Sequence, residues 1–210
     1  FSLRAVERAL ADLRRGRPGA VTGGGGAAGL VLAAEASTAE SLRQLAATAM
    51  AEPALVLTAR RAAVLGLARI GLRAAIVSFD GPLSAEMVHA LADPLSATPA
   101  LPRPPSAISE AAAYSCESAA VLLAKTARLL PAAVGAPVCD PDADDLAKWA
   151  SRHDLLLVDA GDVFQYDFTA ARTLKPVSEA RVPLLGAENA RIIAFRPRDG
   201  GLEHLAVGLG

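Results

Sequence analysis

The stretch VTGGGGAAGLVLAAEAS, residues 21–37, decides how the rest of the chain is interpreted. Four consecutive glycines at 23–26 lie between a short apolar lead-in and the apolar run at 29–36. Two apolar segments around a glycine loop predict two strands joined by a flexible connection. Glycine loops often bind phosphate, but this one lacks both the G-x-G-x-x-G spacing and the lysine of a G-x-x-x-x-G-K-[ST] motif. We interpret it as a flexible loop that could close over a ligand.

In the segments that flank this loop, the spacing of apolar residues is typical of a helix in some and of a strand in others. The pattern predicts helices at 2–15 and 115–130 and strands at 54–58, 73–80 and 155–161. Strands that alternate with helices indicate an α/β or α+β domain, with a mixed sheet and flanking helices.

The end of the chain has a different character. ARIIAFRPRDGGLEHLAVGLG, residues 190–210, is two alternating runs around Asp199-Gly200-Gly201, which predicts a β-hairpin. A lone hairpin is marginally stable unless it packs on something. We therefore expect one domain at 1–172 and a linker with a partial hairpin module at 173–210.

Composition and charge exclude several classes of partner. The 210 residues carry 21 Lys+Arg against 22 Asp+Glu, so the net charge is −1. This balance gives no excess of positive charge for binding nucleic acid or an anionic membrane. No apolar run reaches membrane-spanning length. Two cysteines, Cys116 and Cys139, do not make a disulfide framework. We expect a cytoplasmic protein that binds neither nucleic acid nor membrane.

Several pieces together resemble one family, the 3,4-dihydroxy-2-butanone-4-phosphate synthases of riboflavin biosynthesis. The pieces are GLVLAAEAS, HALADP, the pair Arg103-Pro104, ESAAVLLAK, DDLAKWASRHDLLLV and Tyr166, in the family's order over residues 2–168. Residues 177–210 then resemble the linker and opening strands of GTP cyclohydrolase II, which follows the synthase in many bacterial proteins. The resemblance implies the synthase fold, a ribulose 5-phosphate substrate and a homodimer with the site near its interface.

The positions that carry the family's chemistry differ in this chain. An acidic loop that holds Mg²⁺ in the family falls on residues 20–29, where only Ala, Val, Thr and Gly stand. Mg²⁺ requires oxygen ligands, which Gly and Ala side chains lack. The family's Arg-x-Gly-His-Thr-Glu motif falls on residues 113–118, where Ala113 replaces the phosphate-clamping Arg and Cys116 replaces the His. A second family His is replaced by Ser106.

What remains at these positions defines a candidate site that we expect to work without metal or cofactor. Cys116 begins a predicted helix, where a thiolate is favoured, although a buried small residue is the more common role of a cysteine. Glu117 and Tyr114 are the neighbouring groups that could transfer protons. The predicted catalytic residues are Cys116, Glu117 and Tyr114, and the predicted ligand-binding residues are Thr22, Gly23, Gly24, Gly25, Gly26, Arg103, Ser106 and Ser118.

Three functions fit this pattern. We first expect a synthase homologue that has lost the Mg²⁺-dependent chemistry and is repurposed to bind or transform a different, more apolar, unphosphorylated small molecule, as in specialised-metabolite biosynthesis. Whether it is an enzyme stays open; if so, the reaction would be a metal-independent lyase or cyclase reaction. The alternative is a non-catalytic paralogue that partners or regulates an active riboflavin enzyme. An active synthase ranks last.

Overall fold

The computed structural model describes residues 3–67, 73–96, 103–140, 143–170, 174–197 and 203–209, without the side chains of 167, 168 and 170. The chain forms two compact units, residues 1–164 and 165–210. The predicted domain boundary after residue 172 stays a prediction.

The first unit contains a seven-stranded mixed sheet with the order β5-β4-β3-β6-β2-β1-β7. Strands β1 and β7 pair in parallel, and the other neighbours pair antiparallel. The strands are β1 Gly19–Thr22, β2 Ala28–Ala33, β3 Ala54–Thr58, β4 Ala74–Ser78, β5 Ala107–Glu110, β6 Ala132–Pro137 and β7 Leu157–Asp159. This mixed sheet confirms the predicted fold class.

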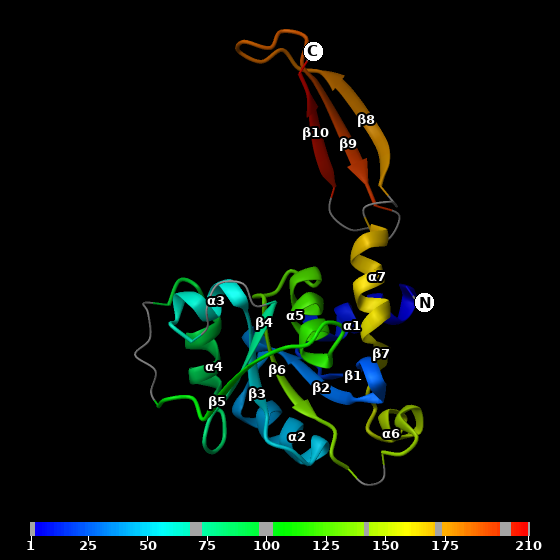
Figure 1. The fold of residues 1–210 in the computed structure, drawn as a ribbon. Helices are drawn as coiled ribbons and strands as arrows, with labels where there is room; N and C mark the ends of the chain where they lie inside the picture. The colour runs from blue at the N-terminus through cyan, green and yellow to red at the C-terminus, as the bar shows by residue number, and fades with distance from the viewer. Residues whose placement is uncertain are drawn as a thin grey trace. The chain divides into compact units, whose positions relative to one another are not determined.

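Helices lie on both faces of this sheet (Figure 1). They are α1 Leu3–Arg14, α2 Ala39–Ala49, α3 Ala59–Val64, α4 Ala85–Ala92, α5 Cys116–Thr126 and α6 Leu146–Arg152, with short 3₁₀ turns η1 Gly24–Gly26 and η2 Ala34–Ala36. Helix α7 Ala160–Ala170 follows β7 and spans the boundary between the two units. Helix α5 ends at Thr126, before the predicted residue 130, because Arg128 takes the left-handed conformation with φ 63°.

Strand β3 shows how the core divides between the two faces. Leu55 and Leu57 point to one face, where residues of α2, α4 and α6 pack on them, whereas Val56 points to the other and contacts Val121 of α5. All three strand residues are 0% exposed. Burial of each such side chain stabilises the fold by roughly 1.5–3 kcal/mol. The unbroken apolar run ALVLT therefore reflects a strand covered on both faces.

The second unit contains a three-stranded antiparallel sheet with the order β10-β9-β8. Its strands are β8 Lys175–Arg181, β9 Arg191–Arg196 and β10 His204–Gly208. Pairing of β9 with β10 confirms the predicted hairpin, whose turn lies outside the described residues. Strand β8 was not expected, because Pro176 and alternating charges hide it in a segment that reads as linker.

None of the helices that the structure describes is long and apolar enough to cross a membrane.

Candidate functional site

The glycine loop between β1 and β2 is tied to the start of α5. The Gly23 N–H donates to the Ala27 carbonyl at 2.7 Å, and the Gly24 N–H donates to the Tyr114 carbonyl at 3.1 Å. Gly25 and Gly26 have φ values of 75° and 81°, which residues with a Cβ rarely adopt. The loop and the segment before α5 thus come together.

Cys116 fills the space beneath this loop. Its thiol donates to the Val21 carbonyl at 3.2 Å, and the side chain is 6% exposed. A Cβ added at Gly29 would lie 3.0 Å from the Cys116 Cβ, and one added at Gly23 would lie 3.2 Å from the Cys116 Sγ. Because these distances are shorter than most real Cβ contacts, glycine at 23 and 29 permits the loop to pack directly on the cysteine without displacing it.

This packing changes the acidity of the thiol. Burial, followed by the nearby charge of Glu117, raises the pKa of Cys116 from 9.0 to about 11. The start of a helix would favour the thiolate, but here desolvation outweighs it. At neutral pH the side chain is a neutral thiol, which supports the structural role more than the nucleophilic one.

Tyr114 lies at the edge of the same region in an unusual conformation. Its φ is 59°, in the left-handed region, and its side chain is 52% exposed. The ring meets Phe164 edge-on, with centroids 4.8 Å apart. A bulky residue persists in this conformation where its surroundings determine it, and such residues often cluster at functional sites.

The remaining residues near the loop use their polar atoms locally. Ser118 is buried and its hydroxyl donates to the Ser115 carbonyl at 3.0 Å. Thr22 donates to Asp159 at 3.1 Å. The other oxygen of Asp159 accepts from the N–H groups of Gly161 and Asp162 at the start of α7. Asp159 was not identified from the sequence. The segment LLLVDAG gave one indication, because Asp159 is an acidic residue at the end of a predicted strand and shortly before a glycine.

Arg103 and Ser106 lie near the β5 edge of the sheet, away from the glycine loop between β1 and β2. Arg103 donates to the carbonyls of Gly81 at 3.1 Å and Pro82 at 2.7 Å, and the Ser106 N–H donates to Ser78. Four strand spacings separate β5 from β2, which amounts to roughly 19 Å. Within one chain, the structure does not bring Arg103 and Ser106 together with the other predicted ligand-binding residues.

The donor set at the loop does not fit magnesium. The side chains of residues 23–29 are hydrogen or methyl groups, and the residue beneath them is a neutral thiol. The carboxylate of Asp159 is already engaged by Thr22 and the start of α7. Across the described residues, no group of three or more His, Cys, Asp or Glu is placed to hold a metal ion.

A separate hollow, the α5 pocket, lies beside α5. It measures about 190 Å³ and is lined by Thr58, Arg73, Ala113, Ser118, Lys125 and Phe164, among others. Residues 22–29 and Cys116 are not part of its lining. It therefore differs from the pocket expected under the glycine loop.

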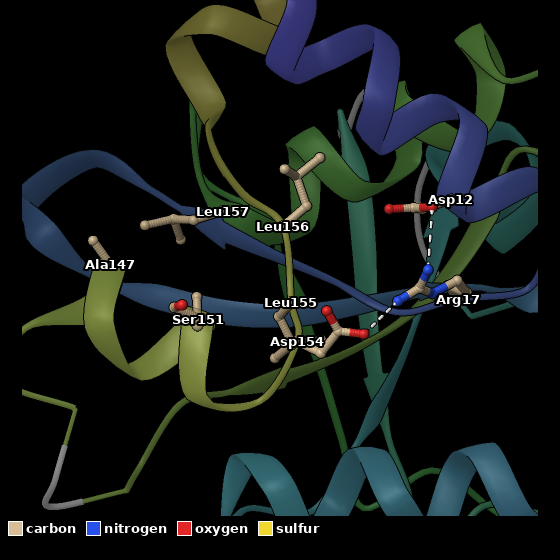
Figure 2. Close-up of a pocket in the computed structure, with 9 residues that line it drawn as sticks. Asp12, Arg17, Ala147, Ser151, Asp154, Leu155, Leu156 and Leu157 are labelled. Carbon is tan, nitrogen blue, oxygen red and sulfur yellow. Dashed lines mark hydrogen bonds and ion pairs between the residues drawn. The ribbon is translucent and has the colours of Figure 1, made fainter.

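A wider groove runs beside the edge strand β7 (Figure 2). It measures about 390 Å³, and Leu155, Leu156 and Leu157 form its apolar side. Arg17 lies at one end between Asp12 and Asp154, with nitrogen–oxygen distances of 3.9 Å and 2.9 Å. Because two carboxylates outnumber the one guanidinium, this end of the groove carries a net negative charge and disfavours an anionic ligand.

Comparison with known proteins gives one curated relative over the full chain. The protein named GTP cyclohydrolase-2 from Azospirillum brasilense is 45% identical over 215 residues. The match covers 100% of this chain and 54% of the relative, so the chain spans about half the length of that protein. No protein-family model matches the chain.

Solved structures share the fold at low sequence identity. A 3,4-dihydroxy-2-butanone 4-phosphate synthase in complex with two magnesium ions has a TM-score of 0.64 at 19% identity, and covers 81% of this chain and 99% of its own. The enzyme from Candida albicans has a TM-score of 0.62 at 21% identity, over 77% of this chain and 96% of its own. RibBX, a two-domain synthase from A. baumannii, covers 98% of this chain and 70% of its own, with a TM-score of 0.59 at 19% identity.

Proposed function

We infer that this chain, a riboflavin-pathway homologue whose first unit has the dihydroxybutanone-phosphate synthase fold, has lost the magnesium-dependent chemistry on ribulose 5-phosphate. One observation carries the inference. The two segments where the family keeps its metal and phosphate ligands meet at Gly24 and Tyr114, yet they bring together glycines, alanines and a neutral thiol. None of these side chains can hold Mg²⁺ or neutralise a phosphate dianion.

Formate release from ribulose 5-phosphate tests this loss directly. With Mg²⁺ present, we expect the protein to release no formate above a no-enzyme control, whereas an active synthase of the same fold does so in parallel. Cys116→His should not restore activity, because one imidazole cannot hold the ion without carboxylates. Formate above the control would overturn the proposal.

A non-catalytic role beside a cyclohydrolase is the function that the loop contacts favour. Cys116 occupies the space beneath the loop, which leaves the fold's former site filled rather than opened for a new substrate. The curated relative, 45% identical along this whole chain, is named for the cyclohydrolase and not for the synthase. Both points support a domain kept as a partner or regulator within a riboflavin-pathway protein.

Binding to an active enzyme tests the partner role. We expect the chain to form a stable complex with a GTP cyclohydrolase II, or to change its rate of GTP turnover, when the two are mixed at micromolar concentration. Light scattering and the turnover assay supply the two readouts. An unchanged mass together with an unchanged rate would count against the role.

Binding of a different small molecule was the first function expected from the sequence. One observation in the structure supports it. The α5 pocket is largely apolar and lies beside Ala113 and Ser118, within the segment that holds the family's second motif. A ligand bound there would be more apolar than a sugar phosphate. Catalysis by this route would also require proton transfer by Tyr114 or Glu117. Nucleophilic chemistry at Cys116 is not supported, because its raised pKa keeps the thiol neutral at neutral pH.

We also propose that the chain forms a homodimer, as the resemblance implies. Strands β8 and β10 each pair on one side in the described residues and leave the other edge available. Light scattering at micromolar concentration should give twice the mass of the 21.4 kDa chain. A monomeric mass would contradict this proposal.

A further inference from the structure

The α5 pocket has a charge pattern that the function proposed above does not use. Two cations, Arg73 and Lys125, stand at its exposed rim, and neither forms an ion pair with another described residue. Among the residues that the structure describes, the lining contains no Asp or Glu. Outside the lining, Glu110 accepts from the Arg73 backbone N–H at 3.4 Å. A ligand in this pocket therefore meets positive charge at the rim.

The interior of the pocket is apolar and offers few other donors. Ala74, Val121 and Leu122 form the floor. The Ser118 hydroxyl donates to the Ser115 carbonyl, and the Thr58 oxygen accepts from the Arg61 N–H, which leaves the Thr58 hydroxyl proton as a donor. A phosphate dianion needs several converging donors. Two separated cations above an apolar floor suit a single carboxylate attached to an apolar body.

The aromatic side of the pocket is held in place. Phe164 lines it, and the Tyr114 ring packs edge-on against Phe164. Tyr114 is in turn fixed by its left-handed backbone and by the bond from Gly24 to its carbonyl. The pocket thus has one rigid aromatic wall, against which a flat apolar group can lie.

The pocket also lies away from the fold's former metal site. Gly29 pairs with Pro137 and Ala54 pairs with Gly135, so the glycine loop stands at the Ala54 end of β3. Thr58 is at the other end of β3, roughly 13 Å further along the strand. The α5 pocket is therefore set apart from the loop on which the family's Mg²⁺ ligands fall, although Ala113, at the family's phosphate-clamping position, belongs to its lining.

We propose that the α5 pocket binds a small organic carboxylate with a flat apolar body, its carboxylate between Arg73 and Lys125 and its body against Phe164. The volume of about 190 Å³ is sufficient for a single ring. This proposal names the ligand class for the ligand-binding role and is independent of the loss of synthase chemistry.

Titration of the full chain with benzoate tests the proposal by NMR. We expect saturable amide shifts at Ser118, Val121 and Lys125, with benzoate binding at least tenfold tighter than benzamide or phenyl phosphate. Lys125→Ala and Arg73→Ala should each weaken benzoate binding about tenfold. Lys148→Ala is the matched control, because Lys148 is also an exposed helical lysine, paired with Asp145 on α6.

Three results would overturn the proposal. They are no saturable shift with benzoate, equal binding of benzamide, or unchanged binding in both cation variants. Tighter binding of phenyl phosphate would reassign the pocket to phosphate esters and overturn the carboxylate claim. Ala113→Phe gives a second check, because Ala113 is exposed and a ring there should fill the pocket without disturbing the core. Formate release would overturn the loss of chemistry without affecting this test.

Discussion

Strands β2 and β10 have similar sequences and opposite surroundings. Strand β2 includes GLVLA at 29–33, and β10 is HLAVG at 204–208. Leu30 and Leu32 are 1% and 0% exposed, whereas Leu205 and Val207 are 69% and 52% exposed. The local sequence favours strand formation in both segments, but the burial of a strand depends on which elements cover the sheet. The first unit covers its sheet with helices, whereas Leu205 and Val207 of the second unit stay in contact with solvent.

Paired truncations would show the largest difference between the two sheets. Leu57→Ala leaves a cavity in the core and should lower the free energy of unfolding by about 2–5 kcal/mol. Leu205→Ala removes an exposed side chain and should change it by less than about 0.5 kcal/mol. Urea unfolding followed by far-UV circular dichroism measures both, and emission of the single Trp149 reports the first unit. Similar losses in the two variants would mean that β10 is covered in solution.

Thiol alkylation should separate the two cysteines by about a hundredfold in rate. Cys116 is buried with its pKa raised to about 11, and Cys139 is exposed. At pH 8, iodoacetamide should modify Cys139 first, with mass spectrometry identifying the peptide. The rate at Cys116 should rise with pH up to about 11. Faster reaction at Cys116 than at Cys139 would indicate an open loop.

The same pKa predicts a pH dependence of stability. The folded state favours the neutral thiol, so the contribution of Cys116 is complete below the unfolded value of 9.0 and is lost as pH rises toward 11. The variant Cys116→Ala should lose less stability across this window than the natural chain. A natural chain with the same pH slope as the variant would contradict this assignment.

Glycine substitutions would test the packing of the loop at a smaller scale. Gly29→Ala places a Cβ 3.0 Å from the Cys116 Cβ and should cost about 1–3 kcal/mol of unfolding free energy. Gly24→Ala is the control, because its Cβ would meet nothing nearer than the Tyr114 carbonyl at 4.0 Å. Urea unfolding compares them. Equal effects would mean that the loop does not rest on Cys116.

The ion pair in the groove beside β7 should give the smallest effect. Arg17 and Asp154 are 2.9 Å apart, but their side chains are 51% and 93% exposed. Exposed pairs contribute about 0–1 kcal/mol and are screened by salt. Arg17→Ala should therefore change the unfolding free energy by less than about 1 kcal/mol, and the change should shrink in 1 M salt. A larger, salt-independent loss would indicate that Arg17 packs as well as pairs.

The sequence predicted the fold better than it predicted the site. Long apolar runs such as ALVLT identify covered strands by themselves, but β5 was missed because all four of its residues are exposed at the sheet edge. The contact between Thr22 and Asp159 joins residues 137 positions apart, which local patterns do not reveal. Arg103 matched a family pair in sequence, yet its hydrogen bonds hold it to the loop at Gly81 and Pro82.

The position of β6 in the sheet has a consequence for how the chain folds during synthesis. Strands β1 and β2 form one local hairpin, and β3, β4 and β5 form a local meander, but β6 is the strand that joins them. The two halves therefore have no shared sheet until residue 137 has left the ribosome. Long-range pairing of this kind slows folding and leaves strand edges exposed in the nascent chain. The β2 and β3 edges thus stay unpaired in the nascent chain until β6 is synthesised.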